Sequence, residues 1–276
     1  AAKKFRANFL EFFRRLVEAS RVDTQHNTMA LKDLALAQTA SALGKCGLAG
    51  VRLSTTLAAM EMGLALAKAR AEIETKLSTA ERQLKAAEGA KGGGGGQKAK
   101  GLRQQVERFK QAMEGLAEVS NIVEEGVFKR RFRDVSEAVR VEAVTYLGKW
   151  MLALPSEYTQ DKYLKYIGWT LNDSSPAVRL CAAKALRPLY TDPALASSLV
   201  AFTTRFHVRV REMLRDMDAK VCTEAAGLLR AILAAGLTEE VVADEAVADV
   251  EACIFEEDLP VAARAQALAF SMDRMQ

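Results

Sequence analysis

The apolar residues of the first part of the chain recur at the spacing of amphipathic helices. Residues 51–69 (VRLSTTLAAMEMGLALAKA) follow glycines at 44, 47 and 50 and predict a strong helix that runs without a stop signal into a charged segment. An earlier amphipathic helix is predicted by the apolar positions Phe5, Phe9, Leu10, Phe12, Phe13, Leu16 and Val17.

Two heptad seams flank a run of glycines. Their apolar positions step by four and three residues, which is typical of helices that pack along a coiled-coil seam. Because the run Gly92 to Gly96 should belong to neither helix, we predict an antiparallel hairpin with a glycine-rich tip. The alternative is two helices that pack on the body of the protein, joined by a disordered loop. The seam positions are Ile73, Leu77, Ala80, Leu84 and Ala87, then Leu102, Val106, Phe109, Met113 and Leu116.

From residue 127 onward, one pattern recurs four times, in RDVSEAVRVEAVTYL, NDSSPAVRLCAAKAL, RDMDAKVCTEAAGLL and FEEDLPVAARAQALA. An anchor valine has an acid five residues before it and an alanine four residues after it, and successive anchors are 39, 43 and 40 residues apart. This period is typical of HEAT-type helix pairs of about 40 to 47 residues. The triplets are Asp134, Val139, Ala143; Asp173, Val178, Ala182; Asp216, Val221, Ala225; and Glu256, Val261, Ala265.

The repeats predict an all-α fold, a HEAT-type helical repeat solenoid with an inserted antiparallel helical hairpin. We expect the acid to stabilise the amides and dipole of a helix start, and the alanine to let helices approach closely. Val51 and Arg52 mark a possible earlier and more divergent copy. The predicted regions are 1–66 (N-terminal helical), 67–125 (hairpin with the glycine-rich tip) and 126–276 (HEAT repeats).

Composition agrees with a folded helical protein. Half of the residues are apolar and 27% are charged, which excludes disorder of the whole chain, and the first 154 residues contain no proline. No stretch approaches the ~18 uninterrupted apolar residues of a membrane span. The chain lacks an initiator Met and stops within a helical pattern, so we expect a piece of a longer protein.

Residues typical of catalytic and metal sites are few in this sequence. The four cysteines form no CxxC pair, which indicates reduced thiols in an intracellular protein. The two histidines, His26 and His207, are far apart in sequence, and we expect a surface polar role for the first and packing or hydrogen bonding for the second. The glycine run lacks the residues of a phosphate loop. We therefore predict no enzyme, no catalytic residue, no cofactor and no metal.

Charge is distributed unevenly. Residues 1–118 carry 20 basic against 12 acidic side chains, residues 119–235 carry 17 against 13, and residues 236–276 carry 2 against 10. The basic front permits a nucleic-acid partner. It contains a small cluster at Lys3, Lys4 and Arg6, and the run 129–133 (KRRFR), which suits phosphates, carboxylates of a partner, or simply a solvated helix start.

Residues 161–173 (DKYLKYIGWTLND) place Trp169 away from the apolar face of their own helix. That face carries Leu164, Ile167 and Leu171, whereas lysines and Asp161 surround the indole. Trp169 either packs on a neighbouring repeat or anchors a partner chain, since aromatic side chains ringed by charge are favoured at interfaces. A second aromatic pair, Phe202 and Phe206, shares one helical face, for which core packing is the default.

Several phrases together resemble one known family. GVFKRRFRDVSEAVR, YLKYIGWTLND, AVRLCAAKALRPLYT and AFTTRFHVRVREM are similar to the stromalin conservative domain of the stromal antigen family, the HEAT-repeat subunit of cohesin. AKKFRANFLEF and LSTTLAAMEMGLAL resemble the region that precedes this domain. The resemblance covers nearly the whole chain and is dense from about 126 to 235.

The resemblance implies a non-enzymatic adaptor of the nucleus and chromatin that acts in sister chromatid cohesion and chromosome organisation. Its implied partners are the kleisin subunit, the SMC ring through kleisin, shugoshin-like regulators, and double-stranded DNA bound without sequence specificity, with no membrane involved. The implied DNA-binding residues are Lys3, Lys4, Arg6, Lys129, Arg130 and Arg131. The implied pocket for kleisin and regulators uses Phe132, Arg133, Asp161, Leu164, Lys165, Trp169, Phe202, Arg205 and Phe206.

Two departures from the family pattern concern the specificity of this pocket. Phe132 stands where the family often has tyrosine, and Ala201 replaces a larger apolar residue. Two other classes of protein also remain open. A generic HEAT scaffold of the nuclear-transport or phosphatase type would bind other partners, and a HEAT-like DNA glycosylase would use an exposed tryptophan beside a carboxylate.

Overall fold

The computed structural model describes residues 2–22, 46–89, 95–236 and 244–274. Throughout these ranges the regular elements are helices and no strand occurs, which confirms the all-α prediction. The chain divides into two compact units, Ala1–Arg131 and Phe132–Gln276.

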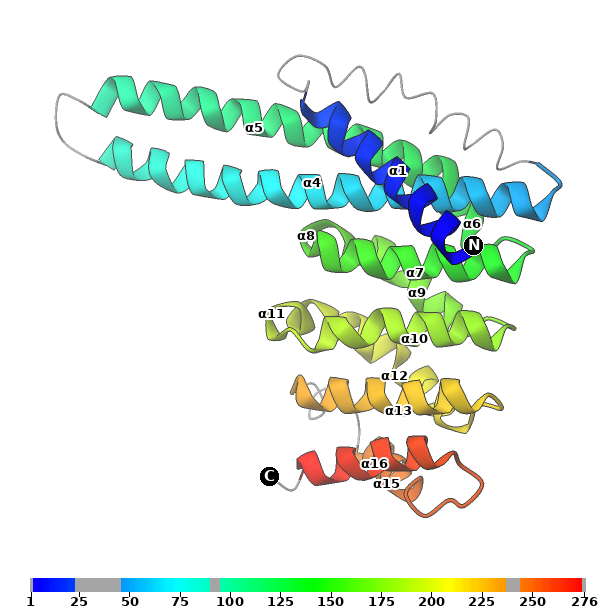
Figure 1. Ribbon diagram of the computed structural model, residues 1–276. Coiled ribbons are helices and arrows are strands. Elements are labelled where there is room, and N and C mark those ends of the chain that lie inside the picture. Colours follow the sequence, from blue (N-terminus) through cyan, green and yellow to red (C-terminus); the bar gives the residue numbers. More distant parts are fainter. Residues whose placement is uncertain (1, 23–45, 90–94, 237–243, 275–276) are drawn as a thin grey trace. The chain divides into compact units, whose positions relative to one another are not determined.

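The first unit contains a long antiparallel hairpin (Figure 1). Its helices are α4 (Ala49–Gly89) and α5 (Gly95–Val123), and α5 continues into a π-helical turn, η1 (Glu124–Phe128), and the short α6 (Lys129–Arg131). Ion pairs join the two helices at Arg103–Glu88, 2.7 Å, and Lys110–Glu81, 3.5 Å. All ten seam positions are buried or half-buried, as the heptad pattern predicts. Residue 67, the expected start of the hairpin, lies inside the continuous helix α4.

The prediction that the glycine run belongs to neither helix was wrong for its last two residues. Gly95 and Gly96 begin α5, whereas residues 92–94 lie outside the described residues. The first amides of a helix have no intrahelical partner, so glycine costs less there than in a helix interior. The run therefore ends inside the first turn.

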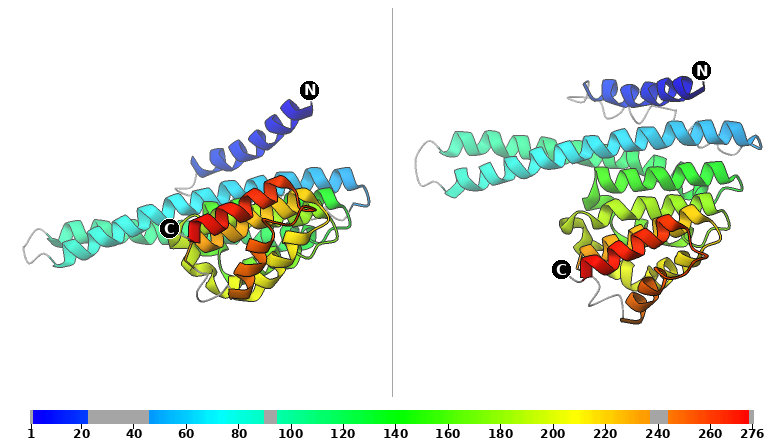
Figure 2. Two further views of the ribbon diagram at one scale, coloured as in Figure 1. Left: turned by 90° about the horizontal axis from the view of Figure 1, so that it is seen from below. Right: turned by 60° about the horizontal axis from the view of Figure 1, so that its bottom comes forward.

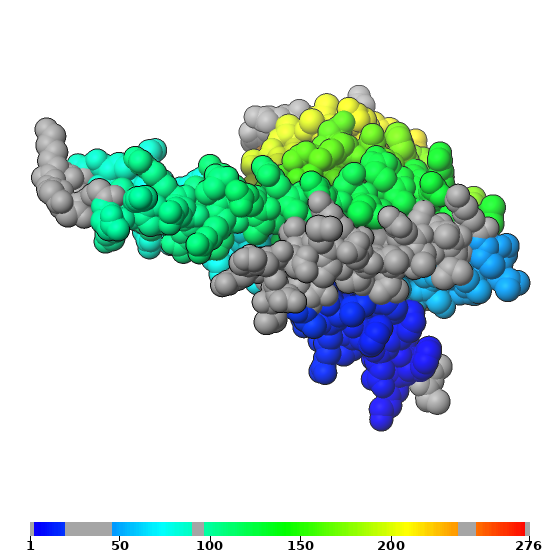
Figure 3. Space-filling model, turned by 90° about the horizontal axis from the view of Figure 1, so that it is seen from above, coloured from blue at the N-terminus to red at the C-terminus, as the bar shows by residue number. Residues whose placement is uncertain are grey.

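The core of the first unit joins α1 (Ala2–Val22) to the hairpin. Phe13 and Val17 of α1 pack with Met62 and Leu66 of α4 and with Leu116 of α5. The amphipathic pattern correctly predicted this helix, but Phe5 and Phe12 are 71% and 60% exposed. Figure 3 shows the long flank of α5, where most side chains between the seam positions are exposed.

The second unit is a stack of helix pairs in two layers (Figures 1 and 2). In the first layer α7 packs on α10, α10 on α13, and α13 on α16. The second layer contains α9, α12 and α15, and short helical turns link the layers. The bounds are α7 Glu137–Ala153, α8 Pro155–Tyr158, α9 Asp161–Thr170, α10 Pro176–Tyr190, α11 Pro193–Ala196, η2 Ser197–Leu199, α12 Val200–Glu212, η3 Met213–Arg215, α13 Ala219–Ala234, α15 Asp244–Ala252 and α16 Val261–Arg274.

The repeat pattern correctly predicted equivalent positions in α7, α10 and α13. Val139, Val178 and Val221 are each the third residue of their helix, and all are 0% exposed. The alanines four positions later are also 0% exposed, so the helices approach closely there. The first three triplets therefore mark equivalent positions.

The fourth triplet was assigned two residues too early. Val261 is the first residue of α16 and is 79% exposed. The third residue is Ala263, 3% exposed, and Ala267, four positions later, is 0% exposed. Asp258 then takes the place of the acid, five residues before Ala263. In VAARAQALA, both Val261 and Ala263 have an alanine four residues later, so either residue fits the repeat pattern. Only Ala263 and Ala267 are buried, which makes Ala263 the equivalent of the earlier valines.

A second feature recurs at the fourth residue of several helices, where an arginine donates a hydrogen bond to a backbone carbonyl six residues earlier. Nη1 of Arg140 donates to the carbonyl of Asp134 at 2.8 Å, and Nη1 of Arg179 donates to the carbonyl of Asp173 at 2.8 Å, in both cases six residues earlier. Arg52, the fourth residue of α4, makes the same contact with the carbonyl of Cys46 at 3.0 Å. This local match supports the prediction that Val51 and Arg52 mark an earlier copy.

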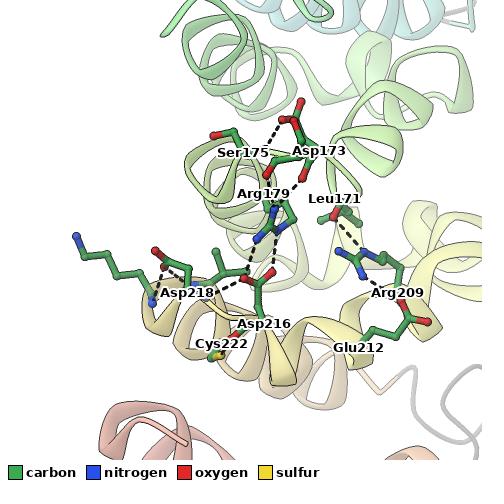
Figure 4. A network of polar contacts seen from close by, with 12 residues as sticks. Leu171, Asp173, Ser175, Arg179, Arg209, Glu212, Asp216, Asp218 and Cys222 are labelled. Carbon is green, nitrogen blue, oxygen red and sulfur yellow. Dashed lines mark hydrogen bonds and ion pairs between the residues drawn. The ribbon is translucent and has the colours of Figure 1, made fainter. Parts of the chain in front are cut away.

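The repeated acid has a different role from the one predicted. Oδ1 of Asp216 accepts the N–H of Asp218, the residue before α13, at 3.0 Å, so it does not cap the first turn itself. Asp218 does so, by accepting the N–H groups of Lys220 and Val221. The main role of the acid is between repeats: both oxygens of Asp216 accept hydrogen bonds from Arg179 at 2.7 Å (Figure 4).

An equivalent pair lies one repeat earlier, where Arg140 donates twice to Asp173 at 2.8 Å. We call the pairs Arg140–Asp173 and Arg179–Asp216 the arginine–aspartate ladder. At the corresponding position of α13 stands Cys222, whose Sγ lies 2.9 Å from the carbonyl of Asp216. Burial raises the pKa of the Cys222 thiol, so the thiol stays protonated and donates. Among the described residues, the last two repeats are instead joined by Arg215–Glu256 and Arg230–Asp273, both at 2.7 Å.

Candidate functional site

Helix α9 presents Trp169 to the surface of the second unit. Leu164, Ile167 and Leu171 are at most 2% exposed, as the apolar pattern predicts, and anchor the helix in the core. Trp169, on the other side of α9, is 53% exposed. An exposed fraction of this size leaves part of the indole available to a partner.

The indole is also held by its neighbours. Tyr166, one turn earlier on α9, meets the Trp169 ring edge-on, with centroids 5.5 Å apart at 90°. Phe132 packs against Tyr166 at 4.7 Å and lies 6.3 Å from Trp169. Trp169 therefore packs on Phe132 and on Tyr166 of its own helix while about half of its surface stays exposed, and its role as an anchor for a partner chain stays a prediction. A fixed aromatic side chain loses little conformational entropy when a partner binds.

Phe132 and Trp169 form one wall of a shallow groove with about 300 Å³ of space, which we call the aromatic groove. Tyr166, which is 8% exposed, packs against both rings without lining the groove. Its other wall is the arginine–aspartate ladder, because Arg140 and Asp173 also line it. The groove thus joins an apolar wall to a polar one whose charges already neutralise each other. The full lining is Phe132, Arg133, Asp134, Arg140, Trp169, Thr170, Asp173 and Ser174.

Cationic side chains border the aromatic wall. Nζ of Lys165 lies 5.9 Å from the Trp169 ring and 5.3 Å from the Tyr166 ring, and Cζ of Arg133 lies 6.0 Å from the Phe132 ring. These contacts lie at the outer limit of cation–π attraction. They leave the charges available for carboxylates of a ligand whose apolar group contacts the indole.

Helix α12 brings the second group of predicted residues against α9, with Phe206 near the C-terminal end of α9 and Arg205 near its start. The ring of Phe206, half-buried, packs on Gly168, where a Cβ atom would come within 2.6 Å of its Cε1. Nη1 of Arg205 contacts Oδ1 of Asp161 at 3.3 Å, and both side chains are exposed. Phe202, 3% exposed, is buried like Leu164. These two predicted site residues support the helices from inside and offer no surface.

The basic clusters lie in the first unit. Lys3, Lys4 and Arg6 are exposed on α1. The run beginning at Lys129 follows the π-helical turn, so it ends a helical segment rather than starting one. Lys129 forms an ion pair with Glu125, whereas Arg130 is exposed.

The remaining candidate residues have structural roles where the structure describes them. Nδ1 of His207 lies 3.2 Å and 3.1 Å from the carbonyls of Thr203 and Thr204, which confirms the hydrogen-bonding role. All four cysteines are free thiols, as predicted, and His26 lies outside the described residues. Within the described ranges, metal-binding side chains do not gather in groups of three, and no helix is long and apolar enough to cross a membrane.

Family models match both units of the chain. The model of the STAG domain matches residues 1–112, and the model of the stromalin conservative domain matches residues 133–207. The chain belongs to the stromal antigen family. The second match contains the aromatic groove except for Phe132, which directly precedes it, and the first contains Lys3, Lys4 and Arg6.

Relatives in the stromal antigen family are cohesin subunits by name. Cohesin subunit SA-3 of Homo sapiens is 34% identical over 84% of this chain and 19% of its own length. Cohesin subunit SA-1 of Xenopus laevis is 28% identical over 95% of this chain and 21% of its own length. The chain thus spans about a fifth of the curated relatives that it matches.

A solved structure has the same fold. Cohesin subunit Scc3 from Z. rouxii, residues 88–1035, superposes with a TM-score of 0.80, at 24% identity, over 96% of this chain and 30% of that chain. This likeness supports the helical repeat solenoid predicted from the sequence.

The sequence did not reveal all residues that form or support the groove of this stromal antigen family member. Tyr166 packs against both aromatic rings of the groove, and outside the groove Gly168 creates the seat for Phe206, yet neither stood out by its residue type. Arg140 and Asp173 were visible in the repeat pattern, but only as structural positions. Their position in the sequence could have indicated them, because Asp173 lies shortly after the end of the helix that carries Trp169.

Proposed function

We propose that this chain is a non-enzymatic part of a cohesin subunit, which binds the kleisin subunit and, through it, the SMC ring. The family membership and the cohesin subunits among its relatives support this role. A stacked helical solenoid also suits an adaptor, because it offers an extended surface to a long, flexible partner. The corresponding place of action is chromatin in the nucleus, in sister chromatid cohesion and chromosome organisation.

The observation that carries the proposal is the half-exposed Trp169. Its indole is fixed by Tyr166 and Phe132 and is bordered by Lys165 and Arg133. A partner segment that places an aromatic or aliphatic side chain on the indole can pair its carboxylates with these cations. Kleisin and short motifs of shugoshin-like regulators would use this groove, and Arg205 and Asp161 would extend the contact along α9.

DNA binding is assigned to the basic clusters of the first unit. Lys3, Lys4, Arg6, Lys129, Arg130 and Arg131 can contact phosphates of double-stranded DNA, which requires no particular base sequence. Fluorescence anisotropy with two labelled duplexes of unrelated sequence tests this. We expect similar affinities for the two duplexes and a steep loss of affinity with salt. Strong preference for one duplex, or salt-independent binding, would contradict the assignment.

The groove does not suit glycosylase chemistry. Asp173 is the carboxylate nearest in sequence to Trp169 in the groove, and both of its oxygens accept hydrogen bonds from Arg140 at 2.8 Å. A carboxylate held in this way is a poor base for activating water. The geometry therefore favours binding over catalysis.

Co-purification with a kleisin fragment tests the proposed function. The chain and a tagged kleisin fragment are expressed together, and we expect them to elute as one complex in size-exclusion chromatography. In a pull-down from nuclear extract, kleisin and SMC subunits should dominate. Enrichment of transport receptors or phosphatase subunits instead, with no kleisin complex, would favour a generic HEAT scaffold and overturn the proposal.

A further inference from the structure

A second groove crosses the first layer of the second unit, over α10, α13 and α16. Its space of about 420 Å³ exceeds the roughly 300 Å³ of the aromatic groove. We call it the three-helix groove, because three successive repeats contribute to it. Its lining is Leu180 and Lys184 from α10, Ala219, Lys220, Thr223 and Glu224 from α13, and Pro260 and Ala262 at the start of α16.

The floor of the three-helix groove is apolar. Leu180 and Pro260 are half-buried, and Ala219 and Ala262 are exposed along the groove. The Thr223 hydroxyl donates to the carbonyl of Ala219 at 2.8 Å, so its hydrogen is already used. A ligand side chain lying on this floor would gain contact area without having to replace strong hydrogen bonds to water.

The rim of the groove is cationic. Lys184 and Lys220 are exposed, and within the described part of the chain neither forms an ion pair. The lining carboxylate, Glu224, is only 8% exposed and forms an ion pair with Arg187 at 3.0 Å. Its charge is therefore compensated, and the groove presents two positive charges above an apolar floor.

We infer that the three-helix groove docks an acidic segment of a partner protein, with apolar side chains on the floor and flanking carboxylates on Lys184 and Lys220. Charge complementarity selects an anionic ligand. The apolar floor favours a peptide over nucleic acid, because phosphates and sugars gain nothing from Leu180 and Pro260. Two carboxylates separated by apolar residues match both the rim and the floor.

The docking surface is independent of the aromatic groove. The three-helix groove is built on the first layer, whereas Trp169 projects from α9 in the second layer. One solenoid can therefore hold two partner segments at once. The inference goes beyond the proposed kleisin and regulator pocket and does not rest on it.

Fluorescence anisotropy with the full 276-residue chain tests the docking surface. The probe is a fluorescein-labelled peptide of about twelve residues, in which two leucines are flanked on both sides by aspartates. We expect the double variant Lys184→Glu/Lys220→Glu to weaken its binding roughly tenfold or more. The same double variant should gain affinity for a peptide in which lysines replace the aspartates.

Matched control variants distinguish an effect of the groove on peptide binding from an effect of the net charge of the protein. Lys85→Glu/Lys98→Glu changes two exposed lysines of the first unit and alters the net charge equally, so we expect unchanged peptide binding. Ala262→Tyr fills the groove from an exposed position, and it should weaken binding while leaving the melting temperature unchanged. Trp169→Ala should bind the peptide normally, which distinguishes this surface from the proposed kleisin pocket.

Three outcomes would overturn the inference. The first is equal peptide binding by the wild type and the Lys184→Glu/Lys220→Glu variant. The second is equal weakening by the Lys85→Glu/Lys98→Glu control, because net charge alone would then explain the effect. The third is a labelled DNA duplex whose affinity depends on Lys184 and Lys220 while the acidic peptide does not bind, because the groove would then serve nucleic acid.

Discussion

Arg179 holds Asp216 through both oxygens of its carboxylate. The Nε and Nη2 atoms of the guanidinium lie 2.7 Å from Oδ2 and Oδ1, across 37 residues of sequence. The side chains are only 14% and 6% exposed, and Nη1 of the same arginine reaches the carbonyl of Asp173 at 2.8 Å. One side chain thus ties together the starts of two successive repeats. Removing it would leave a carboxylate with little access to water.

Replacing Arg179 with methionine should lower the free energy of unfolding by about 3 to 5 kcal/mol, because Asp216 then remains buried without its partner. Urea denaturation followed by circular dichroism measures this difference. The matched control is Arg103→Met, which breaks the Arg103–Glu88 pair, whose side chains are 66% and 42% exposed. An exposed pair should contribute less than about 1 kcal/mol. Equal losses of unfolding free energy from the two substitutions would show that the ladder contributes no more stability than an exposed ion pair does.

The ladder should also make stability depend on pH in the acid range. Burial alone would raise the pKa of Asp216, but hydrogen bonds from Arg179 and from the amide of Asp218 lower it below the ordinary value. The ionised group therefore contributes stability above its unfolded pKa of about 3.9, and this contribution is lost as the pH falls through the folded pKa.

Measured by urea denaturation, the difference in free energy of unfolding between the wild type and Asp216→Asn should be constant near pH 7. It should shrink as the pH falls below about 4. A difference that stays constant or grows down to about pH 3 would contradict this origin of the ladder's stability.

The sequence predicted the repeats because the same physical demand recurs in each of them. Each helix of the first layer buries its third residue, and α7 and α10 place an arginine next to it, so Val139 and Val178 stand out by period alone. In α16 the demand is met by Ala263, and alanine is too common in this segment to mark the position. The repeat pattern therefore pointed to Val261, because this residue is a valine like the three earlier anchors.

The same substitution at two valines tests the corrected register. Val139→Ala removes two methyl groups from a fully buried side chain and should lower the free energy of unfolding by about 1 to 3 kcal/mol. Val261→Ala removes the same atoms from a side chain that is 79% exposed, and should change it by less than about 0.5 kcal/mol. Urea denaturation of both variants decides the matter. A large loss from Val261→Ala would restore the register read from the sequence.

Gly168 should be required for the seat of Phe206. A Cβ at this position would come within 2.6 Å of the Phe206 ring, so Gly168→Ala forces the ring away and should cost about 1 to 3 kcal/mol in thermal or urea denaturation. Gly101→Ala on α5 is the control, since a Cβ there meets nothing within 4 Å. Removing glycine from an open helical position should stabilise by about 0.5 to 1 kcal/mol. Opposite signs for the two variants are expected, and equal signs would contradict the proposed seat.

The aromatic groove shows what a sequence reveals about a site and what it conceals. Trp169 was found because its position conflicts with the apolar face of its own helix. Tyr166 was not found, because a tyrosine on the border of that face fits an ordinary core. Leu164 and Phe202 came from the resemblance, yet burial at 2% and 3% leaves them no surface to offer. Helical periodicity reports which side of a helix is buried, but not which helices meet beside it.

Truncation of Trp169 should weaken kleisin binding and leave the fold intact. The exposed half of the indole gives a partner an apolar surface that alanine cannot provide, so Trp169→Ala should cost about 2 kcal/mol or more of binding free energy. Isothermal titration calorimetry with the kleisin fragment measures the loss, and circular dichroism checks the fold. Leu152→Ala is the control, because Leu152 is 48% exposed on α7 and does not line the aromatic groove. Equal kleisin affinity of the wild type and Trp169→Ala would assign the interface elsewhere on the solenoid, since nothing else in the groove projects an aromatic ring so far into solvent.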